Sequence, residues 1–201
     1  MTPDQYFFMD DDDQKKAILV QCAQRVIPTV GGQMKWRDDG DSLHVTGLFN
    51  GRPARLIFSL SFGSVLLELK MNPVELDNSF YIQVDPDAKA HAAESMERDE
   101  WDEADGTEQK LFLAPHVFFA GEPGELAWAN GMLRKLSQEG QGALLQTLSS
   151  FNRGHFMANT DLLSLDCPAS ITLSPNSGQM VGYYLNLMFM LSNEMDKVWR
   201  S

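Results

Sequence analysis

Residues 179–199 constrain the fold most, because they predict a helix that is apolar on nearly all sides. Between Val181 and Leu191 only Gly182 and Asn186 interrupt the run of apolar side chains. A helix on a protein surface keeps a broad polar face, which this one lacks. It therefore needs two neighbours. One apolar stripe covers a sheet, and the other meets a second helix, a second copy of the chain or a client protein.

The apolar stripes of this helix are our candidate for an interaction surface. Their residues step along the helix by three and four, and four of the eleven methionines of the chain lie in this helix. Methionine is unbranched and polarizable, which suits surfaces that repack around different partners. The candidate interface consists of Tyr184, Leu187, Met188, Leu191 and Met195. The alternative is that these side chains are core, buried between the sheet and helices within residues 126–151.

The periodicity of the rest of the chain predicts an α+β fold with an antiparallel sheet. Helical spacing over residues 14–27 follows the aspartates 10–13, which favour a helix N-terminus, and Pro28 and Gly31 are expected to end that helix. Asn50 and Gly51 are a strong hairpin signal. We expect strands at 34–37, 43–46, 52–62, 65–71, 80–84, 110–119, 155–158, 162–167 and 169–173, with further helices at 126–136 and 142–151.

The order of these elements is an N-terminal helix, an antiparallel β meander, central helices, short strands and a long C-terminal helix. Strands grouped between helices favour α+β over a doubly wound parallel sheet. We expect residues 1–201 to form a single domain with an acidic, flexible insertion at about 86–108.

The net charge of −12 is confined to two segments. Residues 10–13 are four aspartates, and residues 85–108 hold ten acids against two bases, while the other charges balance. Without a cluster of basic side chains the chain is not expected to bind nucleic acid or an anionic membrane. The acidic start and the lack of a long apolar run predict a soluble, cytoplasmic protein.

No catalytic, cofactor or metal site is predicted. Cys22 and Cys167 are expected to be structural core residues. Cys167 begins a Cys-x-x-Ser spacing, but a strand is predicted at 169–173 where a reactive thiol would need a helix N-terminus. The histidines His44, His91, His116 and His155 form no metal-binding pair along one element. A hydrolase site assembled in space stays open, with His116 or His155 beside a serine and an acid.

The element order resembles that of the class I type III secretion chaperones and the related sensory-regulator-like domains of bacteria. The segments that carry the resemblance are residues 14–27, 34–71, 126–151, 155–173 and 179–199. The chain departs from the family in its length, its acidic insertion and a helix pair where the family typically has one helix. The resemblance implies a homodimer without catalysis that binds an extended protein segment along apolar grooves.

These observations predict a non-catalytic protein-binding module of the chaperone or adaptor type, whose partner is a protein client or subunit and which can form a homodimer. Two alternatives stay open. One is the small hydrolase, and the other is an assembly subunit that uses the acidic segment as a docking arm.

Overall fold

A computed structural model describes residues 1–72, 80–84, 117–118, 131, 134–149, 154–158 and 161–198. The predicted acidic insertion at 86–108 lies outside the described residues. So do most of the predicted strand at 110–119 and most of the predicted helix at 126–136.

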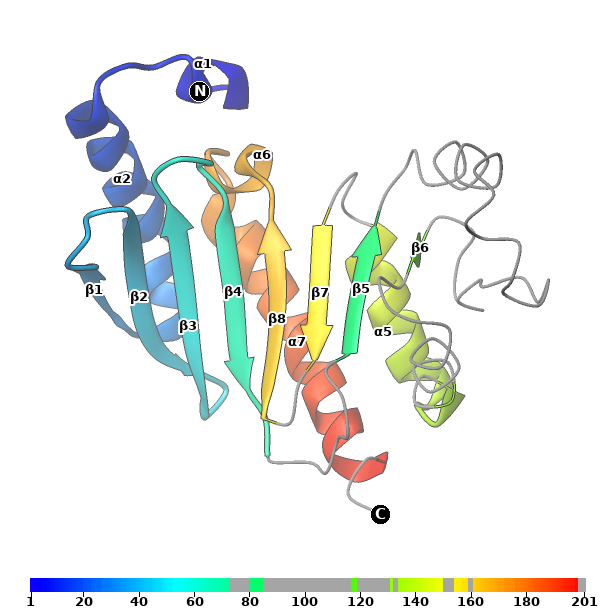
Figure 1. Cartoon of the computed structure of the whole chain (residues 1–201). Helices are drawn as coiled ribbons and strands as arrows, with labels where there is room; N and C mark the ends of the chain where they lie inside the picture. Colours follow the sequence, from blue (N-terminus) through cyan, green and yellow to red (C-terminus); the bar gives the residue numbers. More distant parts are fainter. Residues whose placement is uncertain are drawn as a thin grey trace, which may run out of the picture.

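The described strands form one antiparallel sheet, and the predicted α+β class is confirmed. Its order is β1-β2-β3-β4-β8-β7-β5-β6, so the strands after β4 leave the simple meander (Figure 1). The strands are β1 (Gln33–Trp36), β2 (Ser42–Phe49), β3 (Arg52–Ser59), β4 (Val65–Lys70), β5 (Phe80–Val84), β6 (Val117–Phe118), β7 (Gly154–Ala158) and β8 (Leu162–Cys167).

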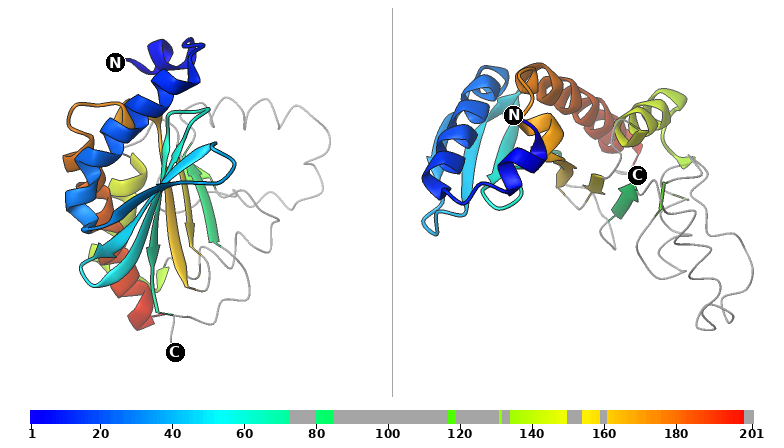
Figure 2. Two further views of the ribbon diagram at one scale, coloured as in Figure 1. Left: turned by 90° about the vertical axis from the view of Figure 1, so that its left-hand side faces the viewer. Right: turned by 90° about the horizontal axis from the view of Figure 1, so that it is seen from above.

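The three long helices lie together on one face of this sheet (Figure 2). The helix α7 contacts α2 on one side and α5 on the other, and it also packs on β4. The core fills the space between these helices and the sheet. The described helices are α1 (Pro3–Phe7), α2 (Asp12–Val30), α5 (Gln138–Ser149), α6 (Ala169–Thr172) and α7 (Ser177–Val198).

The predicted hairpin at Asn50 and Gly51 is confirmed. Both residues have positive φ, 48° and 83°, which is the backbone geometry of a two-residue turn between twisted antiparallel strands. The turn pairs Phe49 with Arg52 and so fixes the register of β2 against β3. That register sends Leu43, Val45 and Phe49 to the helix side of the sheet.

The first predicted helix is confirmed, but its predicted end at Pro28 is wrong. The side chain of Asp11 caps the start of α2 by accepting hydrogen bonds from the N–H groups of Asp13 and Gln14. At the other end α2 continues through Pro28 to Val30. Proline removes one hydrogen bond and crowds the carbonyl of the preceding turn, but Pro28 stands in the last turn of α2, and Gly31 caps the helix three residues later.

The predicted strand at 169–173 is also wrong, since these residues form the short helix α6. Pro168 is extended and stands at the N-cap position, so the chain turns as it leaves β8. Ala169, Ile171 and Leu173 are all buried. A strand with every second residue buried and a single turn of helix can both give this pattern. Sequence periodicity cannot separate the two over so short a run.

Candidate functional site

The five candidate interface residues lie in the core of a single chain. Tyr184, Leu187, Met188, Leu191 and Met195 are none of them more than 5% exposed. The sheet covers one side of α7, and α2 and α5 flank it. This burial matches the core alternative. The interface assigned to these residues stays a prediction, and it requires a neighbouring element to move away from α7 first.

The opposite face of the sheet, which we call the open face, carries the best candidate for a binding surface. No described helix covers it (Figure 2). Residues on β2, β3, β4 and β8 alternate between the core and this face, as expected for antiparallel strands. Leu48 is 59% exposed there, and four further apolar side chains on the same face are half-buried: Ile57, Leu66, Leu162 and Met157.

The strand register places two of these apolar residues side by side in one row. Ile57 on β3 lies directly opposite Leu66 on β4, and His44 on β2 is the next partner along the row. On the other side of Leu66 the row continues to Asp166 on β8. The row across these four strands thus places two apolar side chains between a histidine and an acid.

A second row across the same strands is polar. Nε of Arg55 on β3 donates a hydrogen bond to Oε2 of Glu68 on β4, and this bond holds the pKa of Arg55 above its usual value. Glu68 is buried beneath the arginine. Next to Glu68 in register is Ser164 on β8, whose buried hydroxyl has no hydrogen-bond partner among the described residues. Of these three side chains only that of Arg55, which is 48% exposed, is accessible to a binding partner.

His44 forms a Ser-His pair that the sequence reasoning missed. Its Nε2 lies 3.0 Å from Oγ of Ser42, two residues earlier on β2. Burial lowers the pKa of His44, the nearby Arg55 and Arg37 lower it further, and Glu68 and Asp39 oppose them. In the described part of the chain no carboxylate hydrogen-bonds the other ring nitrogen, so the orienting member of a catalytic triad is missing.

The two histidines singled out for a hydrolase site give no support to one. The backbone of His155 pairs with that of Asp166 between β7 and β8. His116 lies outside the described residues. Among the described residues, no group of three or more histidine, cysteine, aspartate or glutamate side chains could hold a metal ion.

Both cysteines are core residues, as predicted. Cys22 faces inward from α2 and Cys167 from β8, and burial raises the pKa of each thiol. A helix does follow Cys167, contrary to our expectation, but the desolvated thiol stays protonated and therefore unreactive.

A hollow of about 450 Å³ lies where β3 and β4 meet the C-terminal half of α7. Arg52, which lines the hollow, is held by side chains of α7: one Nη donates to Asp196 at 2.6 Å and to Asn193 at 2.8 Å. The N–H and the side-chain amide of Asn72 also donate to Asp196. Arg52 is therefore neutralised, and Lys70, which also lines the hollow, pairs with Asp161 at 3.4 Å.

Comparison with known proteins adds a likeness of fold. No protein-family model matches the chain, and no curated protein sequence matches it. The solved structures include a similar one, the mycobacterial trehalose monomycolate transport factor A, TtfA. The TM-score is 0.52 at 8% sequence identity, over 90% of this chain and 95% of that one. No helix in the described residues has the length and apolar character needed to cross a membrane.

Proposed function

We propose that the protein is a non-catalytic binding module of the chaperone or adaptor type, which holds an extended protein segment on the open face of its sheet. The observation that carries this proposal is the row of partly exposed apolar side chains around Ile57 and Leu66, on a face that no described helix covers. The likeness to TtfA, a transport factor, contributes the fold alone.

An extended segment suits this surface for two reasons. The apolar side chains are spread over several strands, so a long partner contacts more of them than a compact ligand can. The guanidinium of Arg55 is half-exposed above Glu68, and it provides hydrogen-bond donors for a partner backbone.

The test starts from a phage-displayed library of random dodecamers, selected against the immobilised protein. The selected peptides are then titrated against two variants, Ile57→Arg on the open face and Gln21→Arg on the exposed side of α2. We expect Ile57→Arg to weaken binding at least tenfold, because it places a charge in the apolar row. Gln21→Arg adds the same charge elsewhere and is expected to change binding less than twofold.

Two results would contradict the proposal. One is a set of peptides that bind the Ile57→Arg variant as well as the original protein. The other is a stable homodimer, measured by light scattering, that Ile57→Arg converts to a monomer, because a second copy would then occupy the face. Circular dichroism of both variants checks that the fold is intact.

A further inference from the structure

Three exposed phenylalanines gather at one end of the sheet. Phe7 is 46%, Phe8 86% and Phe62 65% exposed. The first two end the helix α1, and Phe62 lies in the turn between β3 and β4. We call these three residues the aromatic end.

The aromatic end is held on well-anchored backbone. Tyr6, next to Phe7, is fully buried, and its hydroxyl donates to the carbonyl of Leu60 at 2.8 Å. The ring of Tyr6 also packs on Gly63, next to Phe62, with ring atoms 3.0 Å from where a Cβ would stand. A capping box between Thr2 and Gln5 fixes the start of α1. Both segments that carry the phenylalanines are therefore tied to each other through Tyr6.

Exposing these rings to water is unfavourable unless a partner covers them. A phenylalanine carries about 200 Å² of surface, so the three together present about 400 Å². The largest contiguous apolar patch on a typical monomer measures about 300–600 Å², and such a patch often marks an interaction site. Aromatic side chains on a preorganised backbone are also the commonest anchors of protein interfaces.

The surroundings of the aromatic end are mainly acidic, although the amino group of Lys15 lies over the ring of Tyr6, 5.7 Å from its centroid. Asp4 lies in α1, and four consecutive aspartates at 10–13 lead into α2, all of them exposed. Consecutive Cα atoms are about 3.8 Å apart, so Asp10 lies within about 8 Å of Phe8. Asp11, Asp12 and Asp13 also serve the N-terminus of α2, but they remain charged and accessible to a partner.

We propose that the aromatic end and these aspartates bind a basic, amphipathic protein segment, with its apolar side on the phenylalanines and its lysines or arginines on the carboxylates. An anionic membrane does not fit, because the five aspartates repel it. A second copy in a two-fold contact does not fit either, because the same patch on both subunits would bring the aspartates together.

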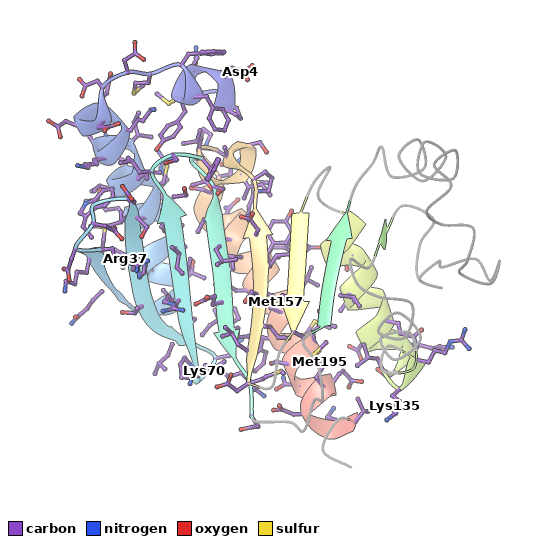
Figure 3. All side chains as sticks on the ribbon, viewed as in Figure 1. Asp4, Arg37, Lys70, Lys135, Met157 and Met195 are labelled. Carbon is purple, nitrogen blue, oxygen red and sulfur yellow. The ribbon has the colours of Figure 1, made fainter. Side chains whose placement is uncertain are left out.

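This surface is separate from the open face. Leu48, the most exposed apolar residue of the open face, pairs with Pro53 at the start of β3, whereas Phe62 follows the end of that strand. In Figure 3 the labelled residue Asp4 lies at the end of the molecule with α1, and Lys70 lies at the opposite end of the sheet. The inference therefore does not depend on the proposed function.

The probe for the test is a fluorescein-labelled peptide of fourteen leucine and lysine residues patterned as an amphipathic helix. Fluorescence anisotropy compares its affinity for the full chain with that for the double variant F8S/F62S, which leaves every charge in place. We expect at least a tenfold loss. The control, Leu48→Ser, removes an apolar side chain of the open face that is 59% exposed, close to the 65% of Phe62, and is expected to change the affinity less than twofold.

A second arm tests the charges. The triple variant D10N/D12N/D13N keeps the capping residue Asp11, and we expect it to bind the probe at least fivefold more weakly. Raising the salt concentration is expected to weaken binding to the original protein more than binding to this variant, because fewer ion pairs remain to be screened.

Three outcomes would overturn the proposal. Equal affinity of F8S/F62S and the original protein would place the probe on other acidic parts of the chain. A loss with Leu48→Ser would move the site to the open face. Vesicles of phosphatidylglycerol that bind the original protein but not F8S/F62S would make the partner a membrane. The first and third outcomes leave the dodecamer experiment on Ile57→Arg unaffected, so the two proposals fail separately.

Discussion

The ion pair between Arg52 and Asp196 is expected to be a large single contribution to stability. The two side chains are only 16% and 10% exposed, and Asp196 accepts hydrogen bonds from Arg52 and from two donors of Asn72. Replacing one member of a buried pair costs about 3–5 kcal/mol, because the other charge stays buried. Asn193 still accepts from Arg52 after Asp196→Ala, so we expect the lower end, about 3 kcal/mol.

Urea unfolding of a double-mutant cycle measures this energy. We expect Arg52→Ala to cost about 2 kcal/mol, since Asn72 continues to bond the carboxylate, and the double variant to cost little more than Asp196→Ala alone. Lys70→Ala is the control: it breaks a pair with Asp161 in which the side chains are 59% and 44% exposed, and it is expected to cost less than about 1 kcal/mol. If the costs of the two single variants add up to the cost of the double variant within about 0.5 kcal/mol, the two side chains are not coupled and the reasoning is refuted.

Three further predictions test other parts of the fold. Tyr6→Phe removes the donor to Leu60 and is expected to lower the free energy of unfolding by about 1 kcal/mol, seen as a lower melting temperature; an unchanged melting temperature would contradict the hydrogen bond. Met188→Lys buries a charge and is expected to cost more than about 4 kcal/mol, whereas Asn186→Lys, on an exposed position, is expected to stay within about 0.5 kcal/mol; equal losses would mean that the helix faces are wrong. The folded chain lowers the pKa of His44 below 6.5, so the unfolded chain takes up the proton first and the stability falls as the pH drops below 6.5. NMR titration of the folded protein should show the lowered pKa. His44→Gln should flatten the dependence of the urea midpoint on pH.

The elements that the sequence predicted best are those fixed by local chemistry. Asn50 and Gly51 specify their hairpin without help from the rest of the chain, because only positive φ closes a turn of that length. The predicted strands at 80–84 and 162–167 agree with β5 and β8 residue for residue. The helix α1 was missed, although Thr2, Pro3 and Gln5 form the usual start of a helix.

The strand order could not be predicted, because it depends on contacts between distant residues. β4 pairs with β8 and not with β5, and the register joins Leu67 to Leu165 across nearly a hundred positions of sequence. Nothing local in either strand favours one antiparallel partner over another. The open face was missed for a related reason, although consecutive apolar residues at 56–58 and 65–67 were a usable signal that these strands are apolar on both sides.

The small residues of α7 indicate which of its faces packs against another helix. Gly178 and Gly182 are four residues apart and so lie on one face of α7, where a Cβ on Gly178 would stand 2.5 Å from the carbonyl oxygen of Arg25, and one on Gly182 would be 3.4 Å from Thr29. That spacing of small residues indicates a helix packed closely alongside, which in this chain is α2. The face of α7 with these glycines is therefore covered by α2, and the five candidate interface residues are buried within the chain. A partner that leaves the helices in place binds elsewhere, such as on the open face or at the aromatic end.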